Sequence, residues 1–281
     1  MKKNITLILL LICSISVYGN EIYFKPYLRY HLPLITQNAP IYFNINVPLY
    51  PPDVRTYTYP IENFSLAEGF KYGGTLGYTF DDVIGVELSS DYFFTDKSIS
   101  NSVLYQNDII NWKLNAWNII PTFTFSRKYI KSSVTGKVGF IAGITGLEKS
   151  VKFDWTDSPT IYKFDRNISV GYTISFEYNY KLSDKLALAA ECGIENTFYT
   201  PSKAELTSYY NLNHPVDYST YIRTIKYVNN IINQQDYRQY NNSSSTIYLP
   251  DQNIPQTRIK ETLRMNSLFL GISLKYNIFK K

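Results

Sequence analysis

The chain has 281 residues, and its 28 Lys and Arg residues against 23 Asp and Glu give a formal net charge of +5. Charged residues make up only 18% of the chain, whereas aromatic residues reach 16% and include 27 tyrosines. This profile excludes a disordered chain, a coiled coil and a disulfide scaffold, and the charge is too small and too dispersed for a nucleic-acid-binding surface.

The N-terminus has the pattern of a secretory signal peptide. Two lysines precede an apolar run from Ile5 to Val17, and small residues follow near Gly19. The apolar run is shorter than the roughly 20 residues that a transmembrane helix needs, which disfavours an uncleaved anchor. We therefore predict that residues 1–19 are a cleaved signal peptide and that residues 20–281 form one domain. Only Cys192 lies in that domain, so it has no intramolecular disulfide.

Eight later segments alternate apolar and polar residues with the period of a β-strand. Because successive strand side chains point to opposite sides of a sheet, each segment has one apolar and one polar face. The alternation is weaker in the first segment and in the fourth, where Ile120 and Pro121 interrupt it. The predicted strands are Ile22–His31, Phe70–Phe80, Ile84–Phe94, Leu114–Ser126, Val134–Thr145, Ile168–Tyr180, Leu186–Ile194 and Leu268–Ile278.

Three features favour a membrane barrel with the apolar face outside. The polar face is rich in Gly, Ser, Thr and Ala, which suit a narrow barrel interior, whereas a soluble exterior would carry more Lys and Glu. Aromatic residues of the apolar face lie towards strand ends, as in interfacial girdles. Short connections also alternate with long ones. The long ones are about His31–Gly69, Thr95–Lys113, Leu147–Asn167 and Tyr199–Leu263.

The predicted fold is therefore all-β: a transmembrane, antiparallel, up-and-down β-barrel of eight strands with long extracellular loops. A soluble exported all-β domain is the alternative. In the first long connection, apolar residues alternate from Ile41 to Leu49. This segment is either a hairpin above the membrane or two further spanning strands, which would give ten, although Pro40 and Pro48 count against spanning strands.

The chain resembles the small outer-membrane barrels of Gram-negative bacteria, the group of OmpX-like, OmpW-like and OmpA-barrel proteins. The resemblance lies in the signal segment, in strands such as Lys71–Phe80, and in the closing strand Leu268–Phe279. That strand resembles the C-terminal aromatic signal read by the barrel-assembly machinery, although Lys280 and Lys281 follow it. The resemblance implies a porin-like, monomeric cell-surface protein of the outer membrane. Its implied partners are outer-membrane lipid, lipopolysaccharide and, during biogenesis, the assembly machinery and periplasmic chaperones.

With the apolar face outward, charged residues of both signs point into the lumen. Unpaired buried charges are unfavourable, and the interior of eight strands is narrow enough for side chains to fill. We therefore predict a lumen plugged by ion pairs. The alternative is a narrow channel for small or amphipathic solutes, in which Glu191→Ala would raise conductance. The predicted lumen charges are Lys25, Arg29, Lys71, Glu87, Asp91, Lys137, Glu177, Glu191, Glu195 and Lys275.

The long connections are rich in Tyr, Asn and Ser, which favours a structural and surface-interaction role such as adhesion or ligand binding. Solvated loops without a fixed ligand are the alternative. A lipid-modifying enzyme is a distant third hypothesis, because it needs a base beside a nucleophile. The only histidines are His31 and His214, and no motif brings either to Ser89, Ser90 or Asp91. We therefore predict no enzymatic activity, cofactor or metal.

Overall fold

The computed structural model describes residues 21–34, 65–81, 83–103, 106–152, 160–208, 224–228, 237–242, 245–250, 256–259 and 262–280. The predicted signal peptide and the alternating segment 41–49 lie outside these residues. Within the described part of the chain, no helix has the length and apolar character needed to span a membrane.

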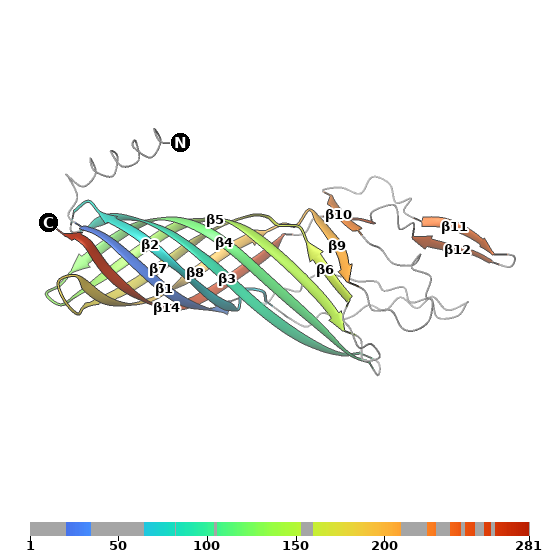
Figure 1. Ribbon diagram of the computed structural model, residues 1–281, viewed down its shortest axis with the longest axis horizontal. Helices are drawn as coiled ribbons and strands as arrows, with labels where there is room; N and C mark the ends of the chain where they lie inside the picture. The colour runs from blue at the N-terminus through green and yellow to red at the C-terminus, as the bar shows by residue number, and fades with distance from the viewer. Residues whose placement is uncertain are drawn as a thin grey trace, which may run out of the picture.

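Eight strands pair antiparallel in a closed ring (Figure 1). Each ring strand pairs with the next one along the chain, and β1 pairs with β14 to close the barrel. The predicted all-β barrel of eight strands is confirmed. The ring strands are β1 (Glu21–Pro33), β2 (Gly69–Thr79), β3 (Ile84–Val103), β4 (Gln106–Lys128), β5 (Ser132–Lys152), β7 (Asn167–Lys181), β8 (Leu186–Tyr199) and β14 (Leu263–Lys280).

Further strands lie beyond one end of the ring, which we call the long-connection end. In the sheet, β6 pairs with β5 and β9, β9 pairs with β10, and β10 pairs in parallel with β13. Strands β11 and β12 form a separate hairpin. In Figure 1 these elements project from the barrel, away from the C-terminus. Their bounds are β6 (Thr160–Phe164), β9 (Lys203–Ser208), β10 (Thr224–Val228), β11 (Tyr237–Asn242), β12 (Ser245–Pro250) and β13 (Gln256–Ile259).

Three of the four predicted long loops contain strands in the structure, and the one between Tyr199 and Leu263 contains β9 to β13. Strands β3 and β4 stay paired through segment 95–113 until Val103 meets Gln106. Likewise β5 continues to Lys152, and β6 pairs with its outer part. Backbone pairing does not require an apolar outer face, so the strands continue where the apolar–polar contrast that identified them ends.

The interruption at Pro121 does not break strand β4. Proline has no N–H to donate, but the β4–β5 register is the same on both sides of it, with Ile119 opposite Ala142 and Thr122 opposite Gly139. Ile120 points into the barrel and is fully buried. The irregular sequence pattern therefore reflects one inward-facing isoleucine and not a shift of register.

The other end of the barrel, the short-turn end, has tight turns between β2 and β3, β4 and β5, and β7 and β8. In the first of these, the Asp81 carboxylate accepts hydrogen bonds from the backbone N–H groups of Ile84 (2.6 Å) and Val83 (2.7 Å). These two donors lower the pKa of Asp81, because they stabilise its charged form. The start of β1 and the end of β14 pair at this same end.

Side-chain burial in the ring is the reverse of that in a soluble domain. The outside carries a continuous band of exposed apolar residues, which we call the apolar belt, whereas many buried side chains are polar or charged. On β3 the belt runs from Ile84 to Phe94, on β4 from Trp117 to Phe125, and on β5 from Val134 to Ile144.

Candidate functional site: the charged lumen

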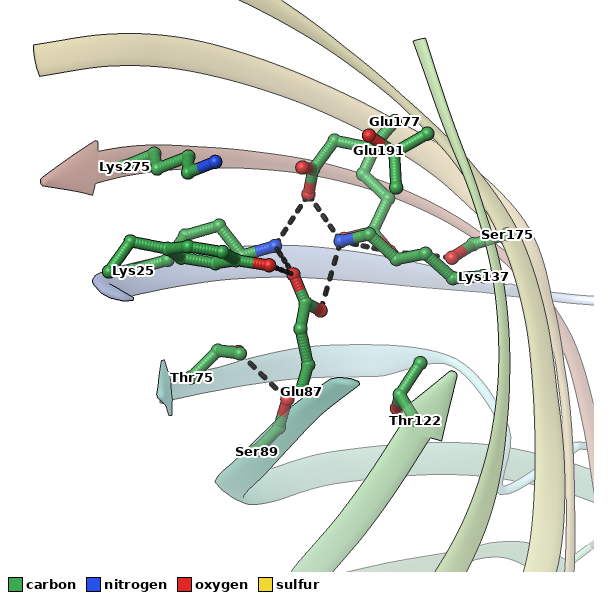
Figure 2. A network of polar contacts seen from close by, with 12 residues as sticks. Lys25, Thr75, Glu87, Ser89, Thr122, Lys137, Ser175, Glu177, Glu191 and Lys275 are labelled. Atoms are coloured by element: carbon green, nitrogen blue, oxygen red, sulfur yellow. Dashed lines mark hydrogen bonds and ion pairs between the residues drawn. The ribbon is translucent and has the colours of Figure 1, made fainter. Parts of the chain in front are cut away.

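Five strands bring charged side chains together in the centre of the lumen (Figure 2). The Lys25 ammonium lies 2.8 Å from a Glu87 oxygen and 2.7 Å from a Glu177 oxygen. Lys137 also contacts Glu177 and lies 3.3 Å from Glu87 and 3.6 Å from Glu191. Each of these five side chains is no more than 4% exposed. Two ammonium groups thus sit between three carboxylates.

Arg29 supplies the third cation. Its Nη2 and Nε atoms donate to one oxygen of Glu191 at 2.8 and 3.2 Å, and Ser175 donates to the other oxygen at 2.6 Å. The guanidinium also stacks on the rings of Tyr27 and Phe269. We call this group the central cluster: Lys25, Arg29, Lys137, Glu87, Glu177 and Glu191. It has three charges of each sign, which is the condition under which buried charges are tolerated.

Two smaller ion pairs flank the central cluster along the barrel axis. Towards the long-connection end, Lys71 contacts Glu195 and lies 3.8 Å from Asp91. Towards the short-turn end, Lys275 lies 3.0 Å from Glu21. The structure therefore places all ten predicted residues inside the barrel, each beside an opposite charge.

Glu21 is a charged partner that the sequence prediction missed. It precedes the first predicted strand, which began at Ile22, so its direction was not assigned. In the structure it is the first residue of β1 and shares the inward face with Tyr23 and Lys25. Counting back in steps of two from Lys25 would have identified it.

Above the ion pairs, at the long-connection end, the lumen is filled by apolar side chains. This packed group, which we call the apolar cap, comes from ring strands, from β6 and β9, and from the segment before β2. The sequence prediction did not include it. Its members are Leu66, Ala67, Phe93, Trp112, Leu114, Ala116, Leu147, Phe164, Tyr199, Ala204, Leu263 and Met265.

His31 lies at the boundary between the ion pairs and the apolar cap. It is 1% exposed, its Nδ1 atom is 2.8 Å from the Ser267 hydroxyl, and its ring stacks on Phe269. His31 Nε2 and one Glu195 oxygen have no hydrogen-bond partner among the described residues, and both residues line a cavity with room for about one water molecule.

The hydroxyl beside His31 belongs to Ser267, which was not among the neighbours considered from the sequence. Ser89 is hydrogen-bonded to Thr75 at 2.7 Å instead, and His214 lies outside the described residues. In the described part of the chain, no three His, Cys, Asp or Glu side chains are grouped so that they could hold a metal ion.

The Tyr23 ring packs directly on Gly77 near the short-turn end. Its hydroxyl donates to Glu87 at 2.8 Å, and the Lys275 ammonium lies 3.8 Å from its ring centroid. A Cβ atom on Gly77 would be 2.1 Å from the ring, which is too close for contact. Only glycine at position 77 leaves room for this ring to reach the central cluster.

Gly77→Ala should therefore destabilise the barrel by about 1–3 kcal/mol, because the added methyl displaces a packed ring and its hydrogen bond. The free energy of unfolding in urea measures this effect. In a Tyr23→Leu background the same substitution should have a much smaller effect. Equal losses in the two backgrounds would show that the ring is not what Gly77 accommodates.

Comparison of the sequence with models of known protein families and with curated proteins finds no match.

Proposed function

We propose that the protein is an integral β-barrel of the outer membrane of a Gram-negative bacterium, exported through a cleaved signal peptide, with a closed lumen and a structural and surface-interaction role. The observation that carries this proposal is a reversal of side-chain polarity along single strands. On β4, Trp117 and Phe123 point outward, and Asn118 and Thr122 point inward. Towards the long-connection end of β4, polar residues point outward and apolar residues point inward.

Beyond Trp117, the outward residues of β4 are Asn115 and Lys113, whereas Leu114 and Trp112 point inward into the apolar cap. Strands β5 and β14 change in the same way. On β5 the last apolar outward residue is Ile144, and Glu148 follows it on the outer face. A protein surface in water places polar groups outside, and one in hydrocarbon places apolar groups outside. The reversal thus supports a strand that crosses from lipid into water.

The dimensions of the apolar belt support the same proposal. The belt on β3, from Ile84 to Phe94, has the length of about 9–11 residues that a tilted strand needs to cross a bilayer. Just past it, Lys113 and Asp96 form an exposed ion pair at 3.6 Å. A closed ring also leaves no unpaired edge strand in hydrocarbon.

The contents of the lumen favour a closed barrel over the alternative of a narrow channel. The central cluster crosses the lumen, and the apolar cap fills it at the long-connection end. To pass through the barrel, water and ions would have to displace both the central cluster and the apolar cap. We therefore propose no transport role.

The surface-interaction role is supported by the extension beyond the belt. Strands β3, β4 and β5 continue past it, and β6, β9, β10 and β13 enlarge the sheet there. In the proposed orientation this extension (Figure 1) faces the cell exterior and meets lipopolysaccharide at its base. The tyrosine-rich loops predicted to bind a ligand lie largely outside the described residues.

Two measurements on the purified protein test this proposal. In unboiled detergent samples the protein should migrate as a compact form that disappears on boiling, since a closed barrel resists detergent until it is heated. Liposomes containing it should show no more swelling in small sugars than empty liposomes. A protein that stays soluble and monomeric in buffer without detergent would refute the membrane location. Rapid swelling would refute the closed lumen and favour the channel.

A further inference from the structure

The short-turn end carries a group of exposed basic and apolar side chains. They come from the β4–β5 turn and the β7–β8 turn, and all are exposed to solvent. We call this group the basic rim: Arg127, Lys128, Tyr129, Ile130, Lys131, Lys181, Leu182 and Lys185.

Backbone hydrogen bonds hold the two turns side by side. The N–H of Lys181 donates to the carbonyl oxygen of Lys131 at 2.9 Å, and the N–H of Asn277 on β14 donates to Lys185 at 2.8 Å. The five cations of the basic rim face two exposed carboxylates in the described part of this end, Asp81 and Asp184. The rim therefore has a local excess of positive charge.

At the opposite border of the apolar belt, two exposed cations lie close to carboxylates. Lys113 lies 3.6 Å from Asp96, and Lys163 lies 3.8 Å from Glu148. At the basic rim, Lys181 lies 2.7 Å from Asp184. Among the described residues, the basic rim thus has more cations than exposed carboxylates.

The apolar members of the basic rim indicate what kind of partner it meets. Ile130 is 95% exposed, and Tyr129 and Leu182 are each more than half exposed. Large apolar side chains interspersed with Lys and Arg are typical of segments at a membrane interface, where the cations reach phosphates and the apolar groups reach acyl chains.

The position of the turns agrees with an interface. Ile130 is four residues from Val134, the last belt residue of β5, or roughly 13 Å along the strand at about 3.3 Å per residue. A strand tilt of about 45° reduces this to about 9 Å along the membrane normal. The headgroup layer extends roughly 5–8 Å beyond the hydrocarbon core. The turns therefore lie at the outer margin of that layer, within reach of long side chains.

We infer that the basic rim binds the phosphate groups of anionic phospholipids in the leaflet that borders the short-turn end. This inference rests on the proposed membrane location and adds a lipid-binding site on one side of it. In the proposed orientation that side is the periplasmic leaflet. Binding there fixes the depth of the barrel and the direction in which the extension projects.

The experiment compares lipid binding by two matched variants. The protein is placed in nanodiscs with equal amounts of phosphatidylglycerol and phosphatidylcholine, and retained lipids are counted by native mass spectrometry. The rim variant is Arg127→Gln, Lys131→Gln and Lys185→Gln. The control variant removes three cations near the opposite border: Lys113→Gln, Lys163→Gln and Arg166→Gln. Compact migration in unboiled gels verifies that each variant folds.

The wild-type protein should retain an excess of phosphatidylglycerol. The rim variant should lose that excess, since each cation near the surface favours anionic lipid by about fivefold, and the control variant should keep it. Equal loss in both variants, or none in the rim variant, would overturn the inference while leaving the barrel intact. An acidic protein that binds the wild type but not the rim variant, without any lipid preference, would also overturn it. Failure to enter nanodiscs would instead contradict the membrane location.

Discussion

Replacing Lys137 with alanine should lower the free energy of unfolding by about 3–5 kcal/mol, because it leaves the buried carboxylates of the central cluster with one counter-charge too few. Lys137 contacts Glu177 and lies within 3.6 Å of both Glu87 and Glu191. Without it, Lys25 and Arg29 face three buried carboxylates. Urea titration of the protein in lipid vesicles, followed by the fraction of compact form on unboiled gels, measures the loss.

Lys113→Ala is the matched control. Lys113 also pairs with a carboxylate, Asp96, but both side chains are about half exposed. Water and salt screen such a pair, so its removal should change stability by about 0–1 kcal/mol. Equal effects of the two substitutions would show that water screens the charges of the central cluster as strongly as it screens an exposed ion pair.

A second variant restores charge balance and side-chain volume together. Lys137→Met together with Glu177→Gln leaves two cations, Lys25 and Arg29, against two carboxylates, Glu87 and Glu191. Similar side-chain volumes are kept, so this double variant should be more stable than Lys137→Ala. If it is no more stable, neither the unpaired charge nor the cavity accounts for the loss in Lys137→Ala.

The central cluster could be predicted from sequence because direction alternates strictly along a strand. Once the apolar face is outside, residues such as Glu87 and Lys137 must point inward, and a narrow lumen brings inward charges close together. What the pattern lacks is the register between strands. It therefore could not say that Lys25 lies between Glu87 and Glu177, or that Lys275 pairs with Glu21.

The apolar cap could not be found by the same rule. The rule placed the apolar face of each predicted strand outside, whereas Leu114 and Leu147 point inward because their strands have passed the end of the apolar belt. The segment 95–113 was predicted to be a loop because the apolar–polar contrast that identified the strands ends before it. The available signal was a shift of the apolar residues from the outer face of a strand to its inner face. It is visible on β4, where Trp117 points outward and Leu114 points inward.

The cap changes the expectation for conductance. Under the alternative of a narrow channel, removing one partner in the lumen, as in Glu191→Ala, was expected to raise conductance. In the structure, Leu114 and Leu147 of the cap are buried beyond the cluster, between it and the long-connection end. We therefore expect Arg29→Ala with Glu191→Ala, which removes a whole ion pair, to give no channels in planar bilayers. The pair Leu114→Ser and Leu147→Ser alone should also be silent, since the central cluster stays closed.

Only the combination of both pairs should conduct, because it loosens the ionic layer and the apolar layer in one barrel. The control combines the same two cap substitutions with Asp96→Ala and Lys113→Ala, which remove an ion pair from the outer surface. It should stay silent while migrating as a compact form before boiling. Channels in Arg29→Ala with Glu191→Ala alone would show that the cap is permeable to ions. Silence of the full combination would mean that the remaining lumen charges, among them Lys25 and Lys137 with Glu87 and Glu177, suffice to close the lumen.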